Sequence, residues 1–373
     1  MANETQTRVY VLGAGCSYDP QHGYPLAKDF VPVLQSYSAK ISSVPECQRI
    51  TKAVDDTAAL LVVCQTAACH ASSLDQLVNL IWNNRCDEQL RALNPHATGH
   101  AIDLRYGAVR KAKIATAACF LDREGPALQQ QIGKYRNFIQ AKILNETGLS
   151  VPCQTRLQRS NARVLTFNYD RLFELAFYGA FADEYLTKRF FPYQAEALNS
   201  GLTPFGEIGE FATERFCFAK LHGSTGVLCI DDAWGQQTAQ IRDVANWKEE
   251  SVTDALFFPA KAAAQVQSEP MIIFPYEKDF VVSGRDSRLP FRDYISKVWA
   301  HATYVLQEAS EIWIVGYSFD PTDCMYLINR LKQAGKCRRI VLQNLAAECD
   351  RIEAFLRVDH EIGIPIEKYA VAF

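Results

Sequence analysis

The sequence has 373 residues, a net charge of -3 and 48% hydrophobic residues, which is typical of a globular protein. Lys and Arg occur in ones and twos, so a basic nucleic-acid-binding face is not indicated. No secretory leader opens the chain, and no apolar run approaches the ~20 residues that span a bilayer. These features predict a cytoplasmic protein, away from the membrane, with one large domain and an insertion or with two domains.

The 12 cysteines raise the question of a metal site. No two of them have the two-residue gap of a zinc knuckle. Cys64, Cys69 and His70 lie close together in sequence, as do His96 and His100, but ordinary helix or loop positions explain both groups more simply. We therefore predict no metal, and thiols that serve mostly as small buried side chains.

The first predicted element is a buried strand at residues 8–12, an apolar run that stops at Gly13. Gly13 and Gly15 allow a close backbone approach that a side chain would block. Amide groups at the start of a following helix could then hold a phosphate. The loop has only two glycines of the three-glycine dinucleotide fingerprint, so a tight turn that needs glycine explains it equally well.

The next hundred residues are predicted to be helical. Leu74, Leu77, Val78 and Trp82 share one face of a helix at 74–82, and residues 105–123 and 127–144 also have helical patterns. We expect residues 45–159 to form a helical insertion. Residues 1–44 with 160–373 would then form the core.

Strand patterns return after the insertion, at residues 162–170, 215–224, 271–275, 311–320 and 338–344. Helical patterns follow at 171–180 and 322–335, and residues 195–215 and 231–270 look rich in loops. Repetition of strand, polar tip and helix indicates parallel strands with crossover helices. The predicted fold class is α/β, with a mostly parallel Rossmann-like sheet, helices on both faces and the large helical insertion.

Ligands of such sheets bind beyond the carboxyl ends of the strands, where several polar residues fall. Asn168 can donate and accept hydrogen bonds, which suits a ribose hydroxyl or a held water, although a turn or cap also explains it. His222 could take a proton near neutral pH, although a single histidine is more often structural. Asp170 is better explained as a helix cap. Other candidate contacts at the tips are Thr166, Gly316, Ser318 and Asn344.

Taken together, the motifs "GAGCS", "TFNYD", "KLHGS" and "VGYSF" resemble the sirtuin-like superfamily. The resemblance is closest to the zinc-free, NAD-hydrolysing sirtuin-like domains of bacterial anti-phage defence systems, and it covers the core strands. It implies that Asn168 supports the nicotinamide ribose and an attacking water, and that His222 is the base near that ribose. It also implies that NAD is contacted at Gly13, Ala14, Gly15, Ser17, Gly316 and Ser318.

The sequence departs from protein-deacylating sirtuins in two respects. It lacks their four zinc cysteines, and their proline-aspartate-phenylalanine-arginine run is replaced by Tyr24, Pro25, Leu26 and Ala27. Both differences point to NAD itself as the substrate. The expected activity is that of an NAD glycohydrolase, a triggered NAD-depleting effector of antiviral defence.

Two alternatives stay open. One is an NAD-dependent protein deacylase or ADP-ribosyltransferase, and the missing cysteines argue against the deacylase. The other is a non-catalytic NAD or ADP-ribose sensor in a larger complex, which would need neither Asn168 nor His222. The helical insertion could make oligomer contacts or receive the trigger, so we expect a homo-oligomer. The resemblance also suggests a partner ATPase encoded alongside.

Overall fold

The centre of the fold is a six-stranded sheet with the order β3-β2-β1-β7-β8-β9. It is seen in a computed structural model that describes residues 7–19, 24–25, 29–43, 48–66, 71, 73–96, 98–144, 160–181, 217–231, 237–241, 267–277, 292–319, 324–371 and 373. The strands are β1 (Arg8–Leu12), β2 (Ala162–Thr166), β3 (Cys217–Lys220), β7 (Glu311–Val315), β8 (Arg339–Gln343) and β9 (Ile366–Tyr369). Every neighbouring pair is parallel, which confirms the predicted α/β class.

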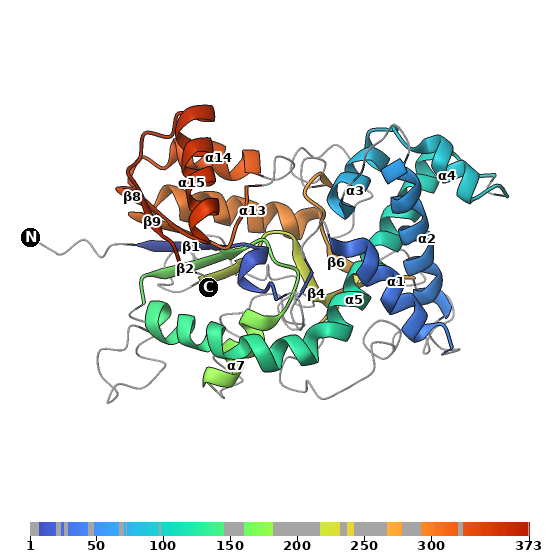
Figure 1. The fold of residues 1–373 in the computed structure, drawn as a ribbon, viewed down its shortest axis with the longest axis horizontal. Coiled ribbons are helices and arrows are strands. Elements are labelled where there is room, and N and C mark those ends of the chain that lie inside the picture. Colours follow the sequence, from blue (N-terminus) through green and yellow to red (C-terminus); the bar gives the residue numbers. More distant parts are fainter. Residues whose placement is uncertain are drawn as a thin grey trace, which may run out of the picture.

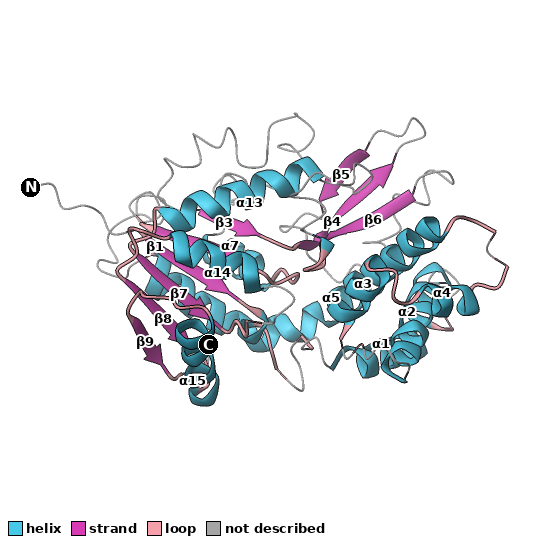
Figure 2. Cartoon of the chain, turned by 90° about the horizontal axis from the view of Figure 1, so that it is seen from above, coloured by secondary structure: helices cyan, strands magenta, loops and turns pink. Residues whose placement is uncertain are grey.

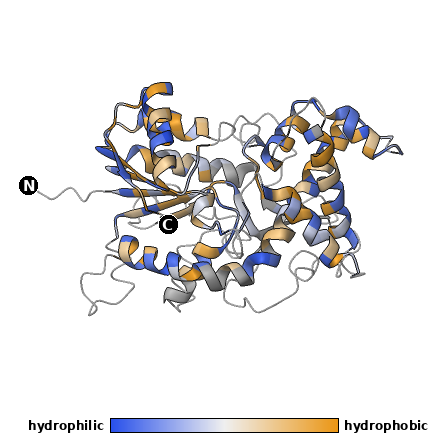
Figure 3. Ribbon diagram, viewed as in Figure 1, coloured by the Kyte–Doolittle hydropathy of each residue, from blue (hydrophilic) through white to orange (hydrophobic). Residues whose placement is uncertain are grey.

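Helices cover both faces of this sheet, which explains the continuous apolar runs of its inner strands. Figure 1 shows α13 (Arg292–Gln307), α14 (Cys324–Gln333) and α15 (Ala346–Ala354) on one side and α7 (Leu172–Phe181) with the end of α5 (Ala101–Phe138) on the other. Val9, Tyr10 and Val11 of β1 are fully buried between these layers. Figure 3 shows the matching hydrophobic stretches along the strands. No helix within the described ranges combines the length and the apolar character needed to cross a membrane.

A second, smaller sheet is antiparallel and has the order β5-β4-β6. Its strands are β4 (Gly223–Asp231), β5 (Gln237–Ile241) and β6 (Gln267–Ile272), and Figure 2 shows it apart from the parallel sheet. The expectation that residues 271–275 add a strand to the parallel sheet is therefore wrong. β6 pairs with β4 and not with a strand of the parallel sheet. β4 itself follows β3 after a turn at residues 221–222, and this connection is too short for the crossover that a parallel strand requires.

Two further strands differ from the sequence-based expectation. β5 lies within residues 231–270, which were expected to be loops. β9 was not predicted, because its sequence IEKY is mostly polar. It is an edge strand, and its last three residues are exposed, so it needs no alternating apolar face.

Helices occupy the predicted insertion: α2 (Gln48–Thr66), α3 (Leu74–Trp82), α4 (Asp87–Leu93) and α5. α2, α3 and α4 gather with α1 (Phe30–Ile41) at one end of the molecule (Figure 2). The predicted helix at 74–82 is confirmed as α3, and its buried residues are Leu74, Leu77, Val78 and Ile81. The Ser73 hydroxyl caps this helix by accepting a hydrogen bond from the Gln76 amide at 3.2 Å.

The two predicted helices at 105–123 and 127–144 form one helix, α5, which continues through Gly125 and Pro126. A π-helical turn follows at Ile139–Ile143. Proline usually interrupts a helix. Here α5 packs along α7, and Glu124, two residues before the proline, makes a buried ion pair with Arg171. Tertiary contacts therefore outweigh the local preference.

Helix α5 connects the helical end of the molecule to the parallel sheet (Figure 1). Near its start, the Lys111 ammonium is 2.6 Å from the Asp56 carboxylate of α2. Near its end, the Phe138 ring packs against the Tyr10 ring of β1, with centroids 5.1 Å apart. The predicted insertion and the predicted core thus share this helix.

Glycines in different environments should respond oppositely to alanine. Gly107 and Gly133 lie within α5, and a Cβ at either would meet nothing within 4 Å. Gly107→Ala and Gly133→Ala should each raise the free energy of unfolding by about 0.5–1 kcal/mol, because alanine is the better helix former. Gly13→Ala should lower it by about 1–3 kcal/mol, since its Cβ would lie 2.4 Å from the Tyr317 Cα. Urea denaturation measures all three, and equal changes would contradict the assignment.

His301 on α13 should make stability depend on pH. Burial lowers the pKa of this fully buried imidazole to about 4, and the Arg163 charge acts in the same direction. The folded protein therefore favours the neutral ring, and stability is lost as the pH falls from about 6.5 towards 4, by up to about 3 kcal/mol. We expect His301→Leu to shrink the difference in unfolding free energy between pH 7.5 and pH 5. Substitution of the exposed His100 by Gln is the control, and an undiminished difference in His301→Leu would refute the prediction.

Candidate functional site

The strand order reverses between β1 and β7. The chain passes from β1 to β2 and β3 on one side, and the later strands β7, β8 and β9 continue on the other. In open parallel sheets, ligands bind beyond the carboxyl ends of the strands at such a reversal. The loops that meet there follow β1, β2 and β7, and they carry most of the predicted site residues.

The loops after β1 and β7 touch backbone to backbone. The Gly13 amide donates to the Val315 carbonyl at 2.9 Å, and the Gly15 amide donates to the Gly316 carbonyl at 2.8 Å. Gly316 has a φ of +59°, and a Cβ on it would lie 2.6 Å from the Cys16 amide nitrogen. Packing therefore explains why glycine occupies these positions, because the close approach that glycine permits is made with the neighbouring loop.

Ala14 and Gly15 are the exposed residues of the loop after β1. Residues Ala14–Cys16 form a short 3-10 turn, in which the Cys16 amide bonds the Gly13 carbonyl and the Ser17 amide bonds the Ala14 carbonyl. Because these amides and that of Gly15 already have partners, a diphosphate would meet the exposed tip and not a row of free amides.

Asn168 and Ser17 are brought together, although they are 151 positions apart. The Asn168 Nδ2 donates to the Ser17 Oγ at 3.3 Å, and the Asn168 amide bonds the Thr166 Oγ1 at 3.1 Å. The Ser17 Oγ is also 2.6 Å from the Tyr135 Oη of α5. Asn168 is 8% exposed, yet its Oδ1 is buried without a hydrogen-bond partner in the described part of the chain. Such an acceptor is uncommon in folded proteins and points to a ligand or water.

Asp170 caps α7, as the sequence indicates. Its carboxylate accepts a hydrogen bond from the Leu172 amide at 3.0 Å. Burial raises the pKa of Asp170, and the nearby Lys220 ammonium opposes this. Lys220 itself is buried and lies 2.9 Å from the Glu174 carboxylate. This cluster holds the loop after β2 in place.

His222 lies in the turn between β3 and β4 and is 3% exposed. Its ring contacts Phe167, Tyr169 and Trp299, with centroids 5.1, 5.9 and 6.2 Å away. Phe167 and Tyr169 flank Asn168 in the sequence, so the two catalytic candidates lie on neighbouring loops. An apolar aromatic setting surrounds the imidazole, and a polar one surrounds the carboxamide.

Ser318 and Asn344 lie at the same edge of the sheet, since the Gly316 amide bonds the Gln343 carbonyl at 3.0 Å. Ser318 is exposed, and its carbonyl accepts a hydrogen bond from Arg351 of α15. The Asn344 Oδ1 accepts from the amide of its own neighbour, Leu345, at 2.9 Å. Their hydrogen bonds lead to α15 and not to the Ser17–Asn168 pair.

The residues that replace the deacylase motif are partly described. Tyr24 is buried, with its ring stacked on Phe120 of α5 at 4.7 Å and its amide bonded to the Ser17 carbonyl at 3.1 Å. Pro25 is half-buried. Leu26 and Ala27 lie outside the described residues. The Tyr24 amide therefore helps to hold the Ser17 backbone in place.

Sequence reasoning missed Tyr135, Lys220 and the pair Arg171–Glu124. The Arg171 Nε donates to the Glu124 Oε1 at 2.7 Å, and both side chains are buried. Tyr135 lies 118 positions from Ser17, within an ordinary helical pattern. No local signal could have shown these contacts, because each joins segments distant in the chain.

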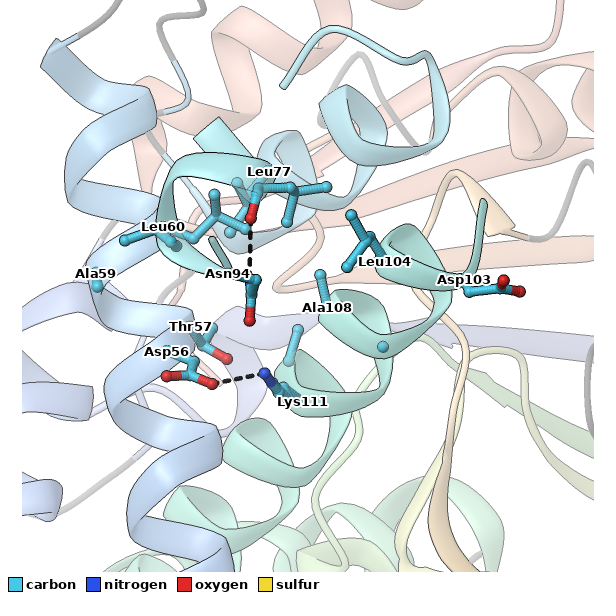
Figure 4. Close-up of a pocket in the computed structure, with 14 residues that line it drawn as sticks. Asp56, Thr57, Ala59, Leu60, Leu77, Asn94, Asp103, Leu104, Ala108 and Lys111 are labelled. Carbon is cyan, nitrogen blue, oxygen red and sulfur yellow. Dashed lines mark hydrogen bonds and ion pairs between the residues drawn. The ribbon is translucent and has the colours of Figure 1, made fainter. Parts of the chain in front are cut away.

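A cavity of about 130 Å³ lies elsewhere, among α2, α3, α4 and α5. Figure 4 shows its wall, with Leu60, Leu77 and Leu104 beside the Asp56–Lys111 ion pair. It contains none of the predicted site residues. Within the described ranges, no group of three His, Cys, Asp or Glu side chains could hold a metal, and Cys69 and His70 are not among those residues.

Comparison with known proteins leaves the family unassigned. No protein-family model matches the sequence, and no curated protein is similar enough to count as a match.

The Arg171–Glu124 pair should be essential to the joint between α5 and α7. Glu124→Gln leaves the Arg171 charge buried without its counter-charge, so it should lower the free energy of unfolding by about 3–5 kcal/mol. The double variant Glu124→Leu/Arg171→Met should recover much of this loss. The exposed pair Arg351–Glu348 provides the control, and Glu348→Gln should cost less than about 1 kcal/mol. Equal losses in Glu124→Gln and Glu348→Gln by urea denaturation would contradict this account.

Proposed function

We propose that this protein is an NAD glycohydrolase that converts NAD and water into nicotinamide and ADP-ribose. The observation that carries the proposal is the buried Oδ1 of Asn168 at the reversal of strand order, which has no hydrogen-bond partner within the described ranges. A carboxamide oxygen in that place can accept a hydrogen bond from a ribose hydroxyl or a water. The motif resemblance supplies the identity of the dinucleotide.

The reaction needs a group that holds the ribose or the water and a group that accepts a proton. Nicotinamide leaves as a neutral ring, because its nitrogen is cationic while bonded to the ribose, and the anomeric carbon becomes oxocarbenium-like. The water oxygen then bonds to that carbon. Asn168 would hold the ribose or the water, and His222 would accept the proton that the water or a ribose hydroxyl loses. Fixed dipoles around the site would stabilise the developing charge.

The glycine loop suits the diphosphate of NAD at its exposed tip, Ala14 and Gly15. Lys134 on α5 is exposed and near enough for its positive charge to act on Cys16. A cation beside the loop supports an anionic ligand there. Exposed Ser318 on the facing loop would contact the same ligand.

The wider setting is part of the same proposal and rests on the motif resemblance. The protein would deplete NAD in antiviral defence after a trigger, in the cytoplasm, as a homo-oligomer with a partner ATPase. The helices at the far end of α5 are available to receive such a trigger.

The test is incubation of the purified protein with NAD and chromatographic resolution of the products. We expect nicotinamide and ADP-ribose from the wild type, and a loss of about 10²–10⁴-fold in Asn168→Ala and His222→Ala. The matched control is His100→Ala, which removes an exposed histidine that is not among the predicted site residues. An acetylated peptide in a parallel reaction reveals a deacylase.

Three outcomes would contradict the proposal. Unchanged rates in both Asn168→Ala and His222→Ala would remove the catalytic assignment. Binding of ADP-ribose without nicotinamide release would favour the sensor. Nicotinamide release only with the acetylated peptide would favour the deacylase.

A further inference from the structure

The hydroxyl of Ser17 is hydrogen-bonded to side chains from two other segments of the chain. Asn168 Nδ2 lies 3.3 Å from its Oγ and Tyr135 Oη lies 2.6 Å from it. A serine hydroxyl has one proton to donate and two lone pairs to accept with, so it can bond both groups at once.

The amide nitrogen of Asn168 can only donate, so the carboxamide presents its nitrogen to Ser17 and turns its oxygen away. That oxygen is buried and has no hydrogen-bond partner among the described residues. The Tyr135 hydroxyl fixes the position of the Ser17 oxygen that receives the bond from Asn168.

We infer that Tyr135 is a positioning residue: through Ser17 it holds the Asn168 carboxamide with its oxygen, not its nitrogen, turned towards the ligand. The buried Oδ1 of Asn168 is therefore an acceptor and selects a ligand group that can donate, such as a hydroxyl or a water. A carbonyl or phosphate oxygen would be rejected at this point. The ligand class is thus a hydroxyl-bearing sugar or its attacking water.

The surroundings of Tyr135 suit this role. It is 1% exposed, and the rings of Phe173 and Phe373 pack on it edge-on at 6.1 and 4.9 Å. Burial raises the pKa of Tyr135 well above its ordinary value, so its hydroxyl stays neutral. The residue belongs to α5, so the helical end of the molecule contributes directly to the candidate site.

This inference rests on the proposed function for its catalytic consequence, so it needs one readout of activity and one that does not depend on NAD. For activity, Tyr135→Phe should lower kcat for nicotinamide release about three- to tenfold with KM nearly unchanged, and Ser17→Ala should lower it further. Tyr37→Phe removes the hydroxyl of another buried tyrosine, on α1, which is not a residue of the candidate site, and should leave both constants unchanged.

The independent readout is the side-chain amide of Asn168 in protein labelled with [15N]asparagine, assigned by its loss in Asn168→Ala. Hydrogen exchange of Nδ2 should be slow in the wild type and at least tenfold faster in Ser17→Ala and Tyr135→Phe, with Tyr37→Phe unchanged. Exchange that is equally slow in Tyr135→Phe would overturn the inference. If the wild type releases nicotinamide, an unchanged kcat in Tyr135→Phe would overturn it too.

The two readouts separate the hypotheses. A wild type that releases no nicotinamide, combined with faster exchange in Tyr135→Phe, would overturn the proposed function and leave the orientation of Asn168 supported. Nicotinamide release with slow exchange in Tyr135→Phe would support the enzyme and reject the role of Tyr135.

Discussion

The backbone contact between the loops after β1 and β7 is the constraint on which the candidate site depends. Gly13, Gly15 and Gly316 let the backbones of the two loops approach each other more closely than a side chain at these positions would allow. The Cys16 thiol adds a contact to the Val315 carbonyl at 3.2 Å. Because this contact fixes the end of the loop, Ser17 is delivered to the neighbouring tip, where Asn168 lies.

Helix α5 is the second determinant, because it joins parts of the molecule that the chain order keeps apart. Its Lys113 ammonium is 3.1 Å from the buried Glu277 carboxylate beyond β6, and its Glu124 pairs with Arg171 before α7. Removing one partner of a buried pair is far more costly than its net contribution. The pairs therefore specify the position of α5 and, with it, that of Tyr135. The same helix offers a physical connection between the helical end and the candidate site.

Features that depend on neighbouring residues could be predicted from the sequence, and features that depend on distant residues could not. The buried runs at 8–12, 162–166, 311–315 and 339–343 were recognisable because strands covered on both faces are continuously apolar. Asp170 was recognisable as a cap because capping is local. The antiparallel pairing of β6 and the continuity of α5 through Pro126 were not, since both depend on partners distant in the chain.

The candidate site shows the same division. Its residues at the strand tips, such as Asn168 and His222, could be named from the sequence because parallel strands place their carboxyl ends together. Their roles relative to one another could not. The glycines of the first motif suggested a phosphate loop, and the structure shows that they first serve the approach of the β7 loop.

By itself, the sequence determined the α/β class, the glycine loop and the polar tips, because hydrophobic patterning and backbone freedom are local properties. Only the tertiary structure decided that Ser17, Asn168 and Tyr135 share one hydrogen-bonded cluster and that the Asn168 oxygen is left open. The reason is that a hydrogen-bond inventory depends on which groups meet. Ser17 lies 118 positions from Tyr135 and 151 from Asn168 in the sequence, and it meets them only because the sheet order and α5 bring them together.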